Sequence, residues 1–215
     1  MNAEKIIAYM VSKGYRISEA PGTLNIVYVE GVNEYGLPNA DRMDEWNDRR
    51  LLIERFQNGW QCIHNVAATT EPGRSATFSK SAAARGGVAR IAFGQYRDAW
   101  RIGLHKSNKK HPALVQVRPV SVHRDANRDG IRNHDKIQTG LFGINQHGTL
   151  GVKSTRVGNW SEGCLVGWDW TSHLQFMNLL NDDVRVQQNR NFEWDTTIIN
   201  GDELYAFEVP SIAAL

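Results

Sequence analysis

The chain has 215 residues, of which 41% are apolar and 22% are charged, and its formal net charge is +2. These values are typical of an ordinary globular protein with one large domain or two small ones, and so small a charge implies no bulk polyanionic partner. No apolar run approaches the ~20 residues of a membrane span, and residues 1–7 lack the apolar core of a signal peptide.

The N-terminal part predicts a helix, a strand and a long loop. Apolar residues recur with a helical period over residues 3–13, and Gly14 is suited to end that helix. Residues 24–29 are rich in β-branched and aromatic side chains, which predicts a strand. Residues 31–48 are rich in Gly, Asn, Asp and Pro and predict a loop.

Most of the remaining chain predicts strands. Asn58-Gly59 supplies the positive φ angles of a tight turn, so residues 51–56 and 60–66 should form a hairpin. Residues 67–87 are small and polar and predict an exposed loop that could act as a lid. Further strands are expected over residues 88–93, 99–104, 113–122, 141–146, 196–199 and 204–209.

A second helix is predicted over residues 170–180, where Asp169 can cap the N-terminus. Many strands with two modest helices predict a mainly β fold, either a sandwich or a barrel. We interpret residues 1–60 as an N-terminal extension packed on a core formed by residues 61–215, together one globular unit.

Residues 143–164 carry the side chains best suited to covalent chemistry. His147 and Cys164 lie 17 positions apart, each beside a glycine. A cysteine nucleophile needs a base within hydrogen-bond reach and N–H groups facing the developing oxyanion. The alternative is that Cys164 is a buried thiol acting as a small apolar side chain, the role expected of Cys62.

The order His-Gly-Thr, then Ser-x-Gly-Cys, is similar to the signature of the YkuD-type L,D-transpeptidases, over residues 140–208. The resemblance implies a β-sandwich catalytic domain with Cys164 as nucleophile and His147 as its base. It also implies that the Gly148 carbonyl orients the imidazole and that N–H groups of Gly163 and Cys164 form the oxyanion hole. Substrate contacts are expected from Trp160, Ser161, Glu162 and Arg156.

Two positions depart from the family pattern. Glu162 replaces the family's histidine before Gly-Cys, and Val166 replaces its arginine two residues after the cysteine. These changes disfavour a substrate carboxylate beside Cys164, unless Arg156 or a base from residues 97–136 compensates. That segment has ten Lys or Arg and four Asp or Glu, a local charge of +6.

The resemblance implies a cysteine acyl-transfer enzyme acting on peptidoglycan stem peptides, with hydrolysis favoured over transpeptidation. Without a signal peptide it would reach the cell wall by another route, such as phage lysis or as part of a virion. Two alternatives stay open: a non-catalytic cell-wall-binding or virion module of the same fold, and a cysteine peptidase or amidase with another substrate. Nucleic-acid binding is not expected, because no basic helix, zinc-finger spacing or phosphate loop is present.

Two groups of residues are considered for metal binding, and no other cofactor is expected. Residues 125–130 resemble the opening of a calcium loop, but Lys136 stands where the terminal carboxylate belongs. Several histidines upstream of His147 could form a metal site or supply a second active-site histidine, although ordinary structural roles are the alternative. The weak calcium ligands are Asp125, Asn127, Asp129 and Asp135, and the histidines are His105, His111, His123 and His134.

Overall fold

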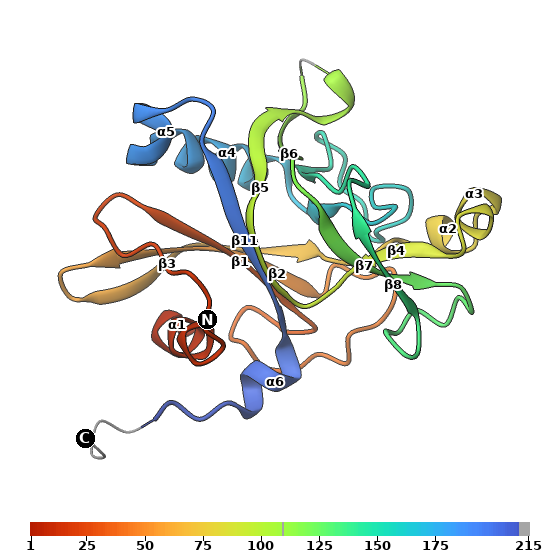
Figure 1. The fold of residues 1–215 in the computed structure, drawn as a ribbon, viewed down its shortest axis with the longest axis horizontal. Coiled ribbons are helices and arrows are strands. Elements are labelled where there is room, and N and C mark those ends of the chain that lie inside the picture. Colours follow the sequence, from red (N-terminus) through yellow and green to blue (C-terminus); the bar gives the residue numbers. More distant parts are fainter. Residues whose placement is uncertain (109, 211–215) are drawn as a thin grey trace.

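The computed structural model of the protein describes residues 1–108 and 110–210 (Figure 1). The fold is mainly β, as the sequence predicts, with a closed barrel, a smaller sheet and short helices around them. The barrel strands are β1 (Leu24–Glu30), β2 (Asp48–Phe56), β3 (Gly59–Thr69), β5 (Gly94–Leu104), β6 (Pro112–Gln116), β9 (Gln146–Gly148), β10 (Leu165–Gly167) and β11 (Glu193–Asn200).

Around the barrel the strands follow the order β1-β11-β5-β6-β9-β10-β3-β2. The smaller sheet has the order β4-β7-β8, with β4 (Val88–Ile91), β7 (Val120–Asp125) and β8 (Lys136–Gly140). The helices are α1 (Ala3–Ser12), α2 (Arg74–Thr77), α3 (Lys80–Ala84), α4 (Trp170–Asp182), α5 (Val184–Gln188) and α6 (Gly201–Ala206), with a 3-10 turn, η1 (His105–Ser107). None of the described helices is long and apolar enough to cross a membrane.

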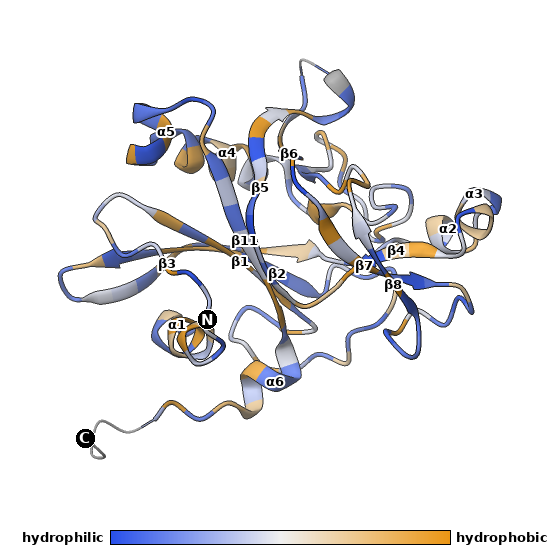
Figure 2. Ribbon diagram, viewed as in Figure 1, coloured by the Kyte–Doolittle hydropathy of each residue, from blue (hydrophilic) through white to orange (hydrophobic). Residues whose placement is uncertain are grey.

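Strand β1 separates two parts of the hydrophobic core and is buried along its whole length. Ile26 and Tyr28 belong to the cluster that includes the two core tryptophans, whereas Val27 and Val29 belong to the cluster that covers α1. This follows from the two-residue period of a strand, which sends alternate side chains to opposite faces. Figure 2 shows apolar residues on both α1 and the barrel strands beside it.

The domain boundary expected at residue 60 is wrong. Strands β1 and β2 are barrel strands, and β1 pairs in parallel with β11 near the other end of the chain. Residues 24–56 are therefore part of the core, and residues 61–215 do not form a separate unit. The pairing could not be predicted from local pattern, because its two strands lie far apart in the sequence.

The best predicted elements carry strong local signals. Helix α1 is followed by Gly14 with a φ of 70°, and β2 and β3 form the expected hairpin, although its turn is Gln57-Asn58 and Gly59 already begins β3. Helix α4 begins after Asp169, whose carboxylate accepts a hydrogen bond from the Ser172 N–H at 2.6 Å. Each signal acts through neighbouring backbone groups, so it does not depend on the rest of the fold.

Residues 67–87 do not form the exposed loop that was expected. Strand β3 continues to Thr69, and α2 and α3 follow, with Thr70 and Glu71 buried between them and the strand. The strand expected over residues 113–122 is divided into β6 and β7. The break contains Pro119, which has no N–H to donate to a strand partner.

Residues 141–145 are not the buried strand that was expected. The Gln116 side chain accepts hydrogen bonds from the N–H groups of Phe142 and Ile144, at 3.1 and 2.9 Å. The Trp100 indole N–H donates to the Ile144 carbonyl at 2.7 Å. These side-chain bonds take the place of strand pairing and hold the segment as a fixed loop.

The strand expected over residues 204–209 is helix α6 and an irregular segment after it. The Asn200 side chain accepts a hydrogen bond from the Glu203 N–H at 3.0 Å and so caps the helix. Asn200 therefore starts a helix where the second strand was expected.

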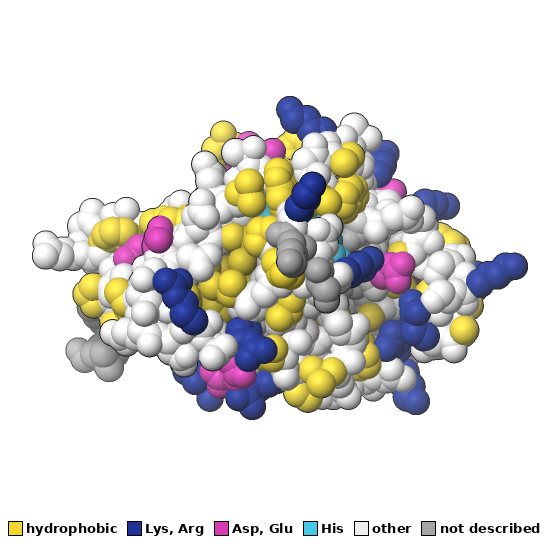
Figure 3. All heavy atoms as spheres, turned by 90° about the horizontal axis from the view of Figure 1, so that it is seen from above, with side chains coloured by type: hydrophobic (Ala, Val, Ile, Leu, Met, Phe, Trp, Pro, Cys, Tyr) yellow, Lys and Arg dark blue, Asp and Glu magenta, His cyan; other side chains and the backbone are white. Residues whose placement is uncertain are grey.

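Lys and Arg side chains project from much of the surface seen from above. Figure 3 shows many of them on the right-hand side, where Figure 1 places the β4-β7-β8 sheet together with α2 and α3.

Candidate active site

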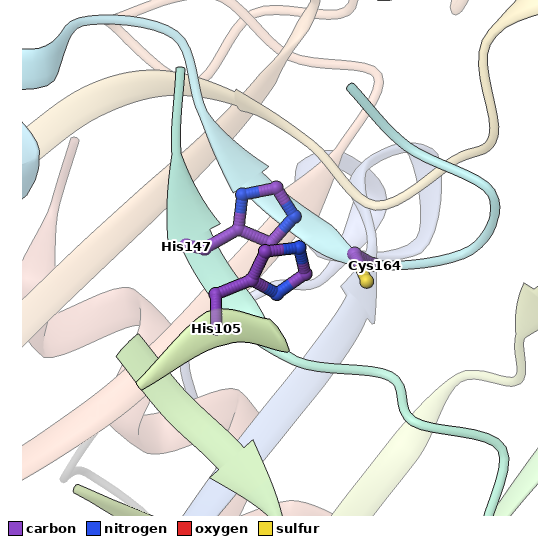
Figure 4. A group of neighbouring side chains, drawn as sticks. All are labelled: His105, His147 and Cys164. Carbon is purple, nitrogen blue, oxygen red and sulfur yellow. The ribbon is translucent and has the colours of Figure 1, made fainter. Parts of the chain in front are cut away.

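Three elements bring His105, His147 and Cys164 together. His147 lies in β9 and pairs with Val166 of the parallel strand β10, which Cys164 directly precedes. His105 begins η1, at the end of β5. The side-chain donor atoms of the three residues lie within 4.8 Å of one another, and Figure 4 shows them converging. The expected proximity of His147 and Cys164 is confirmed.

The Gly148 carbonyl orients the His147 imidazole, as the resemblance implies. The His147 Nδ1–H donates to this oxygen at 2.9 Å, so Nε2 keeps its lone pair. Only 2% of the residue is exposed, and Nε2 has no hydrogen-bond partner in the described part of the chain. Burial and the neighbouring His105 lower the pKa of His147 to about 3. The imidazole is therefore neutral at pH 7 and can accept a proton.

Gly148 is held between two further histidines. The His111 Nε2–H donates to the same carbonyl at 3.0 Å, which fixes the oxygen from a second side. A Cβ at Gly148 would lie 2.7 Å from the His173 Cβ of α4. Glycine is needed here because the helix packs directly on the strand. Sequence reasoning missed His111 in this role.

Cys164 is half-buried, and its thiol is neutral at rest. Its Sγ donates to the Gly143 carbonyl at 3.5 Å, and no described hydrogen bond joins it to an imidazole. Burial raises the pKa of Cys164, while the Asn145 backbone and Lys106 act in the opposite direction. The resting pair is therefore a thiol and a neutral imidazole.

This protonation state predicts how alkylation of Cys164 depends on pH. Its rate with iodoacetamide should keep rising above pH 8, because the reactive thiolate forms only as pH approaches the raised thiol pKa. No inflection is expected near pH 6.5, since His147 stays neutral down to about pH 3. Stopped-time labelling followed by mass spectrometry measures the profile, and a plateau between pH 5 and 8 would instead indicate a thiolate–imidazolium pair.

The oxyanion hole differs from the one expected. The Gly163 N–H donates to the Ser161 hydroxyl at 3.1 Å, and that hydroxyl donates to the Cys164 carbonyl at 2.8 Å. Gly163 is thus occupied, and Ser161 shapes the loop rather than contacting substrate. Within the described residues the Cys164 N–H has no acceptor, so it remains the backbone donor available to an oxyanion.

Gly163 has a structural reason to be glycine. Its φ is 127°, and a Cβ there would lie 2.7 Å from the Ala89 carbonyl oxygen of β4. The nucleophile loop can approach the smaller sheet only because this side chain is missing.

A cleft of about 520 Å³ opens in front of Cys164. Trp160 and Glu162 line it, in agreement with the expected substrate contacts. Arg156 does not line it, and instead forms an ion pair with Glu45 at 2.9 Å beside a separate hollow. Lys106 and Arg124 do line the cleft, and both belong to the basic segment expected to compensate.

His105 is the histidine upstream of His147 that the structure places beside Cys164. The Gln116 N–H donates to Asn145 Oδ1 at 3.0 Å, which fixes the Asn145 amide. The Asn145 Nδ2–H then faces His105 Nδ1 at 3.2 Å, so the proton of that imidazole lies on Nε2. Asn145 lies two positions before His147 in the sequence. Asn145 lies in the loop just before β9, so this contact depends on the fixed path of that loop, and sequence reasoning missed it.

The tautomer of His105 predicts the effect of Asn145→Asp. A carboxylate would require the proton on His105 Nδ1, which removes the Nε2–H donor at neutral pH. The rate of acyl transfer to Cys164 should fall by about 10²-fold at pH 8, and recover at lower pH as His105 becomes doubly protonated. The pH profile of that rate measures this. An unchanged profile in a folded variant would contradict a donor role for His105.

The nitrogen and sulfur donors of the cluster are of the type that zinc accepts, with one side open to the cleft. His147 is oriented as a ligand, whereas His105 directs its lone pair toward Asn145. His123 and His134 are not part of this cluster.

The calcium loop is closed by its own hydrogen bonds. Asp129 accepts from the side chains of Asn127 and Asn133, and Asp125 accepts from the Gly130 N–H. Asp125 and Asp135 each keep one buried oxygen without a partner among the described residues. Weak calcium binding at Asp125, Asn127, Asp129 and Asp135 therefore stays a prediction.

The site lies at the junction of the barrel and the smaller sheet. Comparison of the chain with protein-family models, with curated proteins and with solved structures finds no match.

Proposed function

We propose that the protein is a cysteine acyl-transfer enzyme of the L,D-transpeptidase type that cleaves amide bonds in peptidoglycan stem peptides. The observation that carries the proposal is the buried, unpartnered Nε2 of His147 beside the Cys164 sulfur, at the wall of an open cleft. A buried polar atom without a partner is costly, so its retention at this place supports a role in proton transfer.

The reaction would run through an acyl-enzyme. The Cys164 sulfur forms a bond to the substrate carbonyl carbon while His147 Nε2 takes the thiol proton. The resulting oxyanion accepts hydrogen bonds from the Cys164 N–H and the His105 Nε2–H. The C–N bond then breaks, and the leaving amine takes the proton from His147.

The second half of the reaction releases the acyl group. Water enters the cleft, loses a proton to His147, and forms a bond to the acyl carbon. The C–S bond breaks, and the sulfur takes back the proton. An amine in place of water would give transpeptidation. We favour water because the cleft is open to solvent.

The choice of peptidoglycan rests on the motif resemblance of residues 140–208. Action at the cell wall, as in phage lysis or as part of a virion, belongs to the same proposal. Nucleic acid is not proposed as a partner. The proposal is tested against two other functions. One is a non-catalytic cell-wall-binding module, and the other is a cysteine peptidase or amidase with another substrate.

The test is digestion of purified sacculi, followed by mass spectrometry of the muropeptides. Wild type should cause loss of crosslinks or of terminal residues, and Cys164→Ala should cause none. Cys62→Ala is the matched control. Cys62 lies on β3, where its Sγ donates to the His64 carbonyl at 3.2 Å, and it should keep activity.

New crosslinks would favour the transferase over the hydrolase. Binding to sacculi without any muropeptide change would support the binding module. Thiol-probe labelling of Cys164 without either binding or cleavage would support an amidase of another substrate.

A further inference from the structure

Arg124 is a buried cation without a counter-charge. It lies on β7 and is 8% exposed. Its Nε donates to Gln138 at 2.9 Å, and its Nη1 lies 3.5 Å from the Gly87 carbonyl. No carboxylate pairs with it among the described residues. A buried charge is costly unless it is paired, so this guanidinium lacks a partner that a ligand could supply.

The nearest charged group, Arg85, is also a cation and so does not compensate the charge of Arg124. Burial and the neighbouring Arg85 both lower the pKa of Arg124, and no acidic group opposes them. Arg85 and Lys106 line the same cleft as Arg124, and the histidines there are neutral. Glu162 is the acidic residue of the described lining, and it is exposed and 3.7 Å from Arg85. The cleft therefore carries three cations and one anion.

The fold places Arg124 next to the nucleophile loop. Arg124 pairs with Ala89 of β4, and Ala89 is the residue on which Gly163 packs. The guanidinium also stacks 4.8 Å from the centre of the Phe142 ring, one residue before the Gly143 carbonyl that accepts from Cys164. Both contacts hold the cation on the wall of the cleft that contains the sulfur.

We propose that Arg124, together with Arg85 and Lys106, forms a subsite that binds a carboxylate of the peptide substrate beside the bond that Cys164 attacks. A guanidinium with a free edge suits a carboxylate, because it offers two parallel N–H donors. Nη2 of Arg124 makes no described hydrogen bond and is not among the fully buried unpaired atoms, so it faces accessible space.

The identity of the substrate as a peptide rests on the proposed function. The subsite adds to that function a preference for a substrate carboxylate. Judged from the sequence, Glu162 and Val166 in place of the family's histidine and arginine disfavour an acidic substrate. Bases from β7 and η1 reverse that expectation, because they bring positive charge to the cleft from segments distant in sequence. The protein should thus select peptides with a free carboxylate next to the scissile carbonyl.

The test compares alkylation of Cys164 by iodoacetate and by iodoacetamide in a Cys62→Ala background. In both reactions the sulfur displaces iodide from a CH₂ group, the thiol proton being lost, and only the first reagent carries a carboxylate. The rate ratio of iodoacetate to iodoacetamide should exceed that of free cysteine by about 10-fold or more. It should fall toward the free-cysteine value in Arg124→Gln and at high salt.

Arg101→Gln is the matched control, because Arg101 is an exposed residue of β5 that does not line the cleft. Its ratio should equal that of wild type. If Arg124→Gln does not fold, the test compares the rate ratio of wild type with those of free cysteine and of Arg85→Gln, which should also be lower than that of wild type.

Reaction with iodoacetamide but a ratio equal to that of free cysteine would overturn the carboxylate subsite and leave the nucleophile intact. No reaction of Cys164 with either reagent would overturn the proposed function itself, and the subsite with it. A ratio lowered equally by Arg101→Gln would assign the effect to the general charge of the protein and would also overturn the subsite.

Discussion

His147→Gln should lower the rate of amide cleavage by about 10³-fold, within the range expected for loss of a general base. Glutamine is similar in size but cannot accept the thiol proton. The raised pKa of Cys164 leaves little thiolate to react without a base. Initial rates of muropeptide release measure the effect, with circular dichroism to show that the variant is folded.

His123→Gln is the control for this prediction. His123 lies on β7 outside the His105–His147–Cys164 cluster, so its replacement should keep the wild-type rate within about twofold. Equal rates for His147→Gln and wild type would mean that the base is another group or that Cys164 does not carry the reaction.

Arg90→Met should lower the free energy of unfolding by about 3–5 kcal/mol, because it leaves a buried carboxylate without its partner. Arg90 is 2% exposed and forms an ion pair with the equally buried Glu71. Arg132 is paired with Glu30, and its nearest nitrogen lies 3.8 Å from Glu71, so it compensates only in part. Urea unfolding followed by tryptophan fluorescence measures the loss.

Two further variants test whether the unpaired Glu71 carboxylate causes the loss of stability. Arg118→Met removes an exposed ion pair with Glu193 and should cost at most about 1 kcal/mol. The double variant Arg90→Met/Glu71→Leu should recover most of the lost stability, since both charges are gone. A double variant as unstable as Arg90→Met would show that packing around the arginine, rather than the unpaired carboxylate, sets the loss.

The part of the site that could be predicted from sequence is formed by residues that lie close together in the chain. His147 and Gly148 lie in strand β9, and Cys164 directly precedes the neighbouring strand β10, so the spacing of the motif carries their position in space. The Gly148 carbonyl orients His147 because the two residues are adjacent in the chain.

The other parts depend on contacts that local patterns do not encode. The Gln116 side chain replaces strand pairing for residues 141–145, and the Ser161 hydroxyl takes the Gly163 N–H. The first needs a side chain brought from a distant strand, whereas the second is a local turn bond between residues two positions apart, which the motif resemblance did not reveal. Arg124 reaches the cleft only because β7 pairs with β4 beside the nucleophile loop.

The misread end of the chain is a different case, because its signal was present. Asn200 followed by Asp202 and Glu203 is an N-cap with acidic residues in the first turn, a pattern that favours a helix. The expectation of a strand over residues 204–209 gave no weight to these residues.

The most direct test of the account is a search for the acyl-enzyme. The protein is incubated with a crosslinked muropeptide fraction, quenched in acid, and measured by intact-protein mass spectrometry with peptide mapping. The account predicts an added mass equal to one acyl fragment of the stem peptide, attached to Cys164 and missing from Cys164→Ala. Cleavage of muropeptides by Cys164→Ala at the wild-type rate, with no adduct on the wild-type protein, would contradict it.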